Sequence, residues 1–94
     1  MEAKDLIKLG FEKSELTDKD IVDGSEYKVV DWRVKITDGL FIILTEYHRK
    51  RNGKFEHVEQ ALELINKYCH IGLRGLSFKE LKELIDVLKK YVLP

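Results

Sequence analysis

The chain has 94 residues and a formal net charge of zero, with 44% hydrophobic and 36% charged residues, the composition of a folded globular protein. A chain of this length buries only about 60 to 65% of the surface that its unfolded form exposes, so we expect a single domain, residues 1–94, with one modest core. One cysteine excludes an intramolecular disulfide, and the longest apolar run, residues 40–44, is far shorter than the roughly 20 residues that span a membrane. We therefore expect a cytoplasmic protein without a membrane partner.

The N-terminal part is predicted to contain one short helix and a long loop. Apolar residues at helical spacing precede Gly10, and a glycine just past the last turn is a common helix end, so we predict a helix that ends there. Residues 11–26 are acidic and lack a regular apolar pattern, and Asp23-Gly24-Ser25 has the composition of a turn. We interpret this segment as a loop with at most one turn of helix.

The middle of the chain is predicted to be an antiparallel hairpin. Residues 27–37 alternate between apolar and polar, which indicates a half-buried strand with Trp32 on its core face. The Asp38-Gly39 pair predicts a type I′ turn into a second strand, because both central positions of this turn need positive φ. Asn52-Gly53 marks another turn, after which the chain forms either a third antiparallel strand or a loop.

The C-terminal part is predicted to form two helices. Apolar residues from Val58 to Cys69 recur at helical spacing, which predicts an amphipathic helix with Cys69 as a core thiol. Ser77 precedes Glu80 by three positions, the spacing of a capping box, so a second helix is expected to begin there. The predicted fold class is therefore α+β, with a short N-terminal helix, an antiparallel β-hairpin or three-stranded meander, and two C-terminal helices packed on one face of the sheet.

The charged residues are distributed unevenly along the chain. Residues 1–26 carry a net charge of −4, and residues 27–54 carry a net charge of +4. The candidate partner-binding residues of the basic segment are Arg33, Lys35, Tyr47, His48, Arg49, Lys50, Arg51 and Lys54. Those of the acidic segment are Glu12, Glu15, Asp18, Asp20 and Asp23.

Each charged segment has two interpretations. The basic stretch around Asn52-Gly53 is suited to phosphate contacts, with Tyr47 and Phe55 near enough to stack on bases, or it only keeps a sheet edge soluble. The acidic segment could mimic a track of phosphates and occupy the nucleic-acid channel of a partner, or it is a solvated loop. The meaning of the charge depends on whether the two segments meet in the fold.

No catalytic or metal-binding motif occurs in the sequence. Cys69-His70 lacks the second cysteine that would complete a zinc site with the other histidines, and residues 18–24 depart from a calcium loop because their glycine is one position late. Phosphate-binding loops, nucleophile elbows and zinc-protease signatures are likewise missing. We therefore expect a protein without enzymatic activity, cofactor or metal.

The opening KDLIKLGFEK and the closing LSFKELKELIDVLKKY, with a compact sheet between them, resemble small uncharacterised proteins of phages and mobile elements, particularly those of Bacteroidetes. This resemblance covers the two ends of the chain and transfers no site residue. It implies a host protein or ribonucleoprotein as the partner, because some small proteins of this origin antagonise defence systems, anti-CRISPR proteins among them.

Together these observations predict a non-catalytic protein-binding module, a phage-type inhibitor of a host nucleic-acid enzyme or defence complex. The alternative is a small protein that binds RNA or single-stranded nucleic acid through the basic hairpin, with Arg33 and Lys35 extending the basic surface across the sheet. The chain is expected to be a monomer or a homodimer that pairs through an exposed sheet edge.

Overall fold

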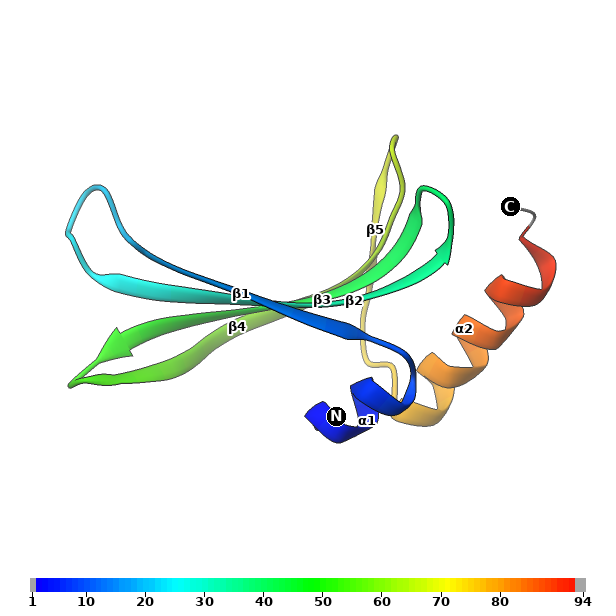
Figure 1. The fold of residues 1–94 in the computed structure, drawn as a ribbon, viewed down its shortest axis with the longest axis horizontal. Helices are drawn as coiled ribbons and strands as arrows, with labels where there is room; N and C mark the ends of the chain where they lie inside the picture. The colour runs from blue at the N-terminus through cyan, green and yellow to red at the C-terminus, as the bar shows by residue number, and fades with distance from the viewer. Residues whose placement is uncertain (1, 93–94) are drawn as a thin grey trace.

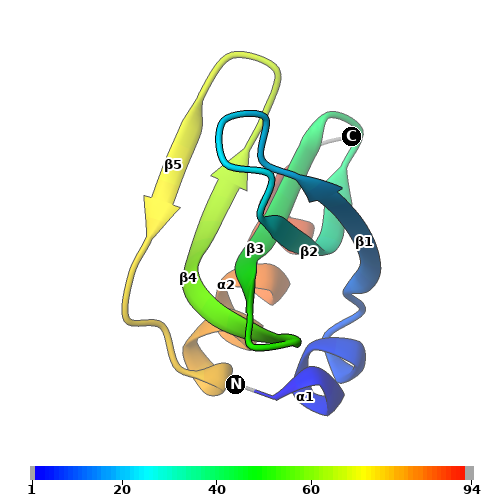
Figure 2. The same ribbon diagram turned by 90° about the vertical axis from the view of Figure 1, so that its left-hand side faces the viewer.

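In the computed structural model, which describes residues 2–92, the chain forms one antiparallel sheet of five strands with a helix at each end of the sequence (Figure 1). The elements are α1 (Ala3–Lys8), β1 (Glu12–Lys19), β2 (Glu26–Thr37), β3 (Leu40–Arg51), β4 (Lys54–Ile65), β5 (His70–Leu73) and α2 (Phe78–Tyr91). Each strand pairs with the next in the sequence, so the sheet is a simple meander, and Figure 2 shows the strands side by side from β5 to β1.

The sheet is long and strongly twisted. Strands β2, β3 and β4 have 12 residues each, which corresponds to about 40 Å of extended chain, and the molecule measures 46 Å along its longest axis. Both helices lie on the same side of the sheet and at one end of it, whereas the opposite end consists only of hairpins (Figure 1). The far half of the sheet is therefore not covered by a helix.

The core lies between the two helices and one face of the central strands. Val30, Trp32 and Val34 of β2, together with Ile42 and Leu44 of β3, form the sheet side of this core. The helices and their connections contribute the other buried side chains, which are Leu6, Phe11, Leu81 and Ile85. The prediction that Trp32 belongs to the core is confirmed, since its side chain is 4% exposed. We call this side of the sheet the helix-covered face and the other side the open face.

Local signals at both helices are confirmed. Helix α1 ends shortly before Gly10, whose φ of 90° lies in the region that glycine adopts without strain. At the start of α2, the Glu80 backbone N–H donates to Ser77 Oγ at 3.2 Å, and the Ser77 backbone N–H donates to Glu80 Oε1 at 3.1 Å. These reciprocal bonds are the predicted capping box.

The hairpin of β2 and β3 is confirmed, but its turn is not the predicted type I′. Among the residues that the structure describes, Asn52 is the only non-glycine residue with positive φ, so Asp38 does not have the required conformation. A register shift between Lys35 and Thr37 accompanies this turn instead. The pair with positive φ at both positions is Asn52-Gly53, at 53° and 79°, which joins β3 to β4.

The predicted helix from Val58 to Cys69 is wrong, because most of this segment is strand β4. The tight Asn52-Gly53 turn returns the chain antiparallel to β3, and β4 then pairs with β3 along nearly its whole length. In this pairing Leu62 and Leu64 alternate onto the helix-covered face. The apolar residues of this segment fit both the spacing of a helix and the alternation of a strand. Pairing with β3 selects the strand.

The predicted loop over residues 11–26 is also wrong. Residues Glu12–Lys19 form edge strand β1, in which every residue is exposed, and only residues 20–25 form a turn. Because no side chain of β1 is buried, the strand carries no apolar alternation, and its backbone pairing with β2 alone defines it. The predicted fold class, with a hairpin or three-stranded meander and two C-terminal helices packed on the sheet, is therefore corrected to a five-stranded meander with α2 as the C-terminal helix.

Candidate functional site

The basic stretch at the end of β3 is divided between the two faces of the sheet. Successive residues of a strand point to opposite faces, so Tyr47, Arg49 and Arg51 lie on the open face. His48 and Lys50 lie on the helix-covered face, beyond the helices. The structure therefore does not gather the predicted basic residues into one patch.

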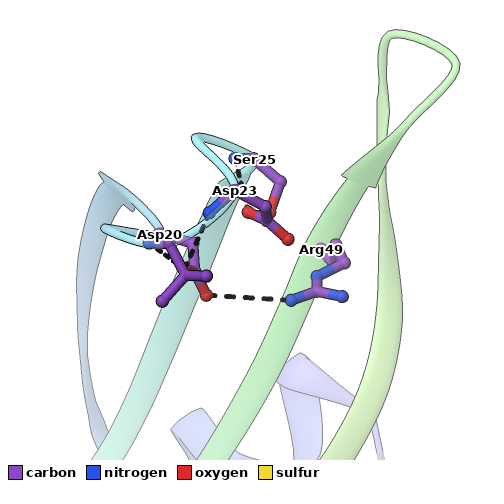
Figure 3. A network of polar contacts seen from close by, with 5 residues as sticks. Asp20, Asp23, Ser25 and Arg49 are labelled. Carbon is purple, nitrogen blue, oxygen red and sulfur yellow. Dashed lines mark hydrogen bonds and ion pairs between the residues drawn. The ribbon is translucent and has the colours of Figure 1, made fainter.

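The acidic and basic segments meet at the hairpin end of the sheet. Lys50 Nζ lies 2.9 Å from Glu26 Oε2, and this pairing lowers the pKa of Glu26 below its ordinary value. Arg49 Nη2 lies 4.0 Å from Asp20 Oδ2, as Figure 3 shows. Opposite charges that lie apart in the sequence thus offset each other in the fold.

The carboxylates of the turn over residues 20–25 bind groups of the turn itself (Figure 3). Asp20 Oδ1 accepts the backbone N–H of Val22 at 2.8 Å, and Asp23 Oδ1 accepts the Ser25 hydroxyl at 2.6 Å and its backbone N–H at 2.8 Å. The hydroxyl of Ser25, followed by its backbone N–H, lowers the pKa of Asp23. These are turn-forming bonds typical of aspartate, so part of the hydrogen-bonding capacity of both carboxylates is used within the turn.

Arg33 and Lys35 both lie on the open face, near the Asp38-Gly39 turn. The guanidinium of Arg33 is 5.4 Å from the centre of the Phe41 ring, and Glu12 is its neighbour on β1. Lys35 forms an ion pair with Asp38, which lowers the pKa of that carboxyl. These two cations are thus stacked or paired.

The other predicted residues of the open face lie toward the hairpin end. Asp18 is the register partner of Tyr27, and Lys54 is the register partner of Arg51. Arg51 Nε lies 3.9 Å from Glu56 Oε2. Charges of both signs therefore border this part of the open face.

Apolar and aromatic side chains form much of the open face although no helix covers it. The rings of Tyr27 and Tyr47 stack with their centres 5.7 Å apart. The half-buried apolar and aromatic residues on this face are Tyr27, Val29, Phe41, Ile43, Tyr47 and Ile65. These side chains are each half-buried, and neither helix covers them.

A polar cavity of about 270 Å³ lies on the helix-covered face, beside α1. We call it the Glu46 pocket. Its polar and aromatic lining consists of Lys13, Glu15, Lys28, Trp32, Glu46, His48 and Gln60. Strands β1 to β4 all contribute side chains to this pocket, because antiparallel pairing places these residues next to one another across the sheet, beside the apolar core.

Glu46 occupies the border between the core and this pocket. Trp32 Nε1 donates a hydrogen bond to Glu46 Oε1 at 2.9 Å, and His48 Nε2 lies 3.7 Å from Glu46 Oε2, too far for a hydrogen bond. The Glu46 side chain is 25% exposed, and that of His48 is 17% exposed. On the other side of the pocket, Lys13 Nζ pairs with Glu15 Oε1 at 2.8 Å and lowers the pKa of Glu15.

The pocket joins residues that the sequence placed in different segments. Glu15 came from the acidic candidates and His48 from the basic ones, and antiparallel pairing places both at one cavity. Glu46, Trp32 and Lys28 were not predicted as site residues. A signal for Glu46 was available, since it is two positions from His48 in a predicted strand and therefore shares its face.

A larger groove of about 840 Å³ lies on the same side of the sheet, along β4, β5 and the segment that leads into α2. Leu62, Leu73 and Leu76 line it, and Arg74 stands among them. Its walls are open and of mixed polarity, so the groove does not indicate a particular class of ligand.

Cys69 is exposed, so the prediction of a core thiol is wrong. It follows the end of β4, in a turn where the side-chain Oδ1 of Asn66 accepts its backbone N–H at 2.8 Å. Within residues 2–92, no group of three or more histidine, cysteine or acidic side chains could hold a metal ion. Neither helix in this range is long and apolar enough to cross a membrane.

No family model, curated protein or solved structure matches this chain.

Proposed function

We propose that this protein is a non-catalytic protein-binding module and that its partner docks on the open face of the sheet. The observation that carries this proposal is the one-sided arrangement of the helices. Both pack on the helix-covered face, so the apolar and aromatic side chains of β2, β3 and β4 on the other face have no covering layer. An exposed apolar surface bordered by charges is typical of a protein interaction site.

The dimensions of the molecule support a large interface. Its accessible surface is 6962 Å², against about 5,700 Å² for a compact monomer of this mass. Its radius of gyration is 15.0 Å, against about 12 Å for a compact domain of this length. The excess of about 1,300 Å² is more than the roughly 800 Å² that one partner contributes to an interface of standard size.

The side chains of the open face are also of the kinds that dominate binding energies. Tyrosine and arginine are enriched at interface hot spots, because each combines a rigid or planar contact area with hydrogen-bonding groups. Tyr47 stacks on Tyr27, and Arg33 lies over Phe41, so these groups are already ordered before a partner arrives. Ordering them in advance lowers the entropic cost of association.

The charged segments are weaker candidates for the main contact surface. Arg49 and Lys50 lie beside Asp20 and Glu26, so phosphate groups would compete with carboxylates of the same chain. Arg33 has Glu12 as its neighbour on β1. The nucleic-acid alternative therefore has less support than a protein partner with a mixed, partly apolar surface.

The resemblance to small phage proteins points to a host protein or ribonucleoprotein as this partner, and to inhibition as the consequence of binding. The first experiment is capture of partners by the tagged protein from host lysate, with and without nuclease. A partner that survives nuclease supports the proposal and becomes the enzyme to assay for inhibition. Loss of every partner on nuclease treatment would favour the nucleic-acid alternative.

Variants then locate the surface. Arg33→Glu and Tyr47→Ala change the open face, and we expect each to weaken partner binding by about tenfold or more, as hot-spot substitutions do. Lys79→Glu makes the same charge change as Arg33→Glu on an exposed position of α2, and it should leave binding unchanged. Circular dichroism confirms that all three variants fold. Equal binding by Arg33→Glu, Tyr47→Ala and the wild type would refute the open-face assignment.

A further inference from the structure

We propose that the Glu46 pocket binds a primary ammonium or guanidinium group carried on a short aliphatic stem. The pocket is on the helix-covered face, so this site is independent of the open face and of the proposed partner. The cation would bind to the carboxylate of Glu46, and its stem would pack on the apolar side chains at the border of the core.

The state of Glu46 is the first reason. Its side chain is three-quarters buried, and a buried carboxylate is costly unless charges or hydrogen bonds compensate it. Trp32 Nε1 satisfies Oε1, but Oε2 has only His48 Nε2 at 3.7 Å. Among residues 2–92, no lysine or arginine forms an ion pair with Glu46. The carboxylate therefore has unused capacity to accept hydrogen bonds at the wall of a cavity.

The two lysines that line the pocket have partners other than Glu46. Lys13 is paired with Glu15 at 2.8 Å and lies 5.4 Å from the centre of the Trp32 ring. Lys28 Nζ lies 5.2 Å from the centre of the Phe55 ring, toward the hairpin end. The position of Lys13 also shows that a carboxylate and the indole ring of this pocket accept an ammonium group together.

The size and walls of the pocket define the ligand further. At about 270 Å³ it is smaller than the roughly 300 to 1,000 Å³ of sites for drug-sized molecules, so it suits one side-chain-sized group. Val30 and Leu44 provide apolar wall next to Glu46 and are 4% and 8% exposed. An aliphatic stem fits these walls, and its cationic end would meet Glu46, the carboxylate of the pocket with which neither Lys13 nor Lys28 forms an ion pair.

Trp32 makes the pocket directly observable. It is the only tryptophan of the chain, and it lines the pocket, so its fluorescence reports on ligands that bind there. We expect n-butylguanidinium and n-butylammonium to change this fluorescence saturably, with dissociation constants of roughly millimolar magnitude at neutral pH and constant ionic strength. Pentanoate carries the same butyl stem with the opposite charge, and it should cause no saturable change. Pentanoate binding as tightly as the cations would overturn the proposal, as would absence of binding by both cations.

A pair of isosteric variants tests the role of Glu46. Glu46→Gln keeps an oxygen that can accept from Trp32 Nε1 and removes the charge, and it should weaken both cations by about tenfold. Glu59→Gln removes one charge from an exposed position of β4 on the open face and should change affinity less than twofold. If the two variants bind the cations equally, Glu46 is not the acceptor and the proposed site is wrong. In the wild type, the NMR resonance of the Trp32 indole N–H gives a second measure of ligand binding that does not depend on either variant.

A peptide distinguishes two sources of such a cation. Acetyl-Gly-Arg-Gly-amide presents the guanidinium as a side chain of a polypeptide. Binding of this peptide at least as tightly as n-butylguanidinium supports a protein side chain as the ligand. Binding of the free cations but not of the peptide supports a small amine or guanidine compound as the ligand. In both cases Glu46→Gln must weaken the binding for the proposed site to hold.

Discussion

A single hydrogen bond, from Trp32 to Glu46, connects the core of this protein to the Glu46 pocket. The indole is 4% exposed and packs among core side chains, yet its one polar atom is directed to a carboxylate outside the core. A buried indole N–H usually finds an acceptor, because leaving it unsatisfied costs the desolvation of the group. Glu46 therefore has a structural role as well as the binding role that we propose for it.

These two roles can be separated by stability measurements. We expect Glu46→Ala to lower the free energy of unfolding by about 1 to 3 kcal/mol, because Trp32 Nε1 loses its acceptor in a buried position. Glu46→Gln should cost less, since its amide oxygen can still accept the bond. Urea denaturation followed by tryptophan fluorescence measures both values. Equal stability of Glu46→Ala and the wild type would show that another group satisfies the indole.

The N-terminus of helix α2 is set by a local interaction between residues three positions apart. The capping box of Ser77 and Glu80 satisfies two backbone N–H groups that the first turn leaves without helical partners. The Ser77 backbone N–H, followed by its side chain, lowers the pKa of Glu80 below its ordinary value of 4.5. Because the folded-state pKa is depressed, this carboxylate stabilises the fold above the unfolded-state pKa, and the contribution disappears as the pH falls through the folded value.

The Glu80→Gln variant keeps an acceptor for the Ser77 N–H and does not titrate, so its stability can be compared with that of the wild type as the pH falls. Between roughly pH 6 and pH 3, we expect the wild type to lose more stability than this variant, with the divergence starting near the ordinary glutamate pKa. Thermal unfolding midpoints over this range provide the measurement. The other acidic groups are common to both proteins, so parallel curves would mean that the box contributes no pH dependence.

The whole molecule is a long, twisted sheet with its helices at one end. This shape leaves a single layer of strands over the hairpin end, which has few buried side chains and carries its polar residues on both faces. The edge strand β1 is protected from pairing with other chains by its five charged residues. The charged edge therefore agrees with our proposal that a partner docks on the open face.

A consequence for the isolated protein is that it should be monomeric. Light scattering at micromolar concentration should report a mass near 11.1 kDa, and small-angle scattering should report an elongated particle. The charged edge and the mixed charge of the open face both oppose association of two copies. A mass of twice this value would mean that a second copy already occupies the open face or the edge.

Several elements follow from short-range patterns that a reader of the sequence can find. The glycine at the end of α1, the alternation of β2 around Trp32 and the capping box of α2 each involve residues within a few positions of one another. Such local preferences can be recognised in the sequence because the residues that interact are separated by a fixed, short spacing. His48 and Glu15 became candidates through the charge of their segments, and no such pattern linked them to each other.

Local patterns were thus enough to predict α1, α2, the central hairpin and the uneven distribution of charge. The apolar residues of β4 fit the spacing of a helix as well as that of a strand, and pairing with β3 selects the strand. Only the tertiary structure made β1 a strand, because its pairing is through the backbone, and brought Asp20 to Arg49 and Glu15 to the pocket of Glu46. The physical reason is that strand pairing joins residues far apart in the chain, and no local pattern records which distant segment a strand will meet.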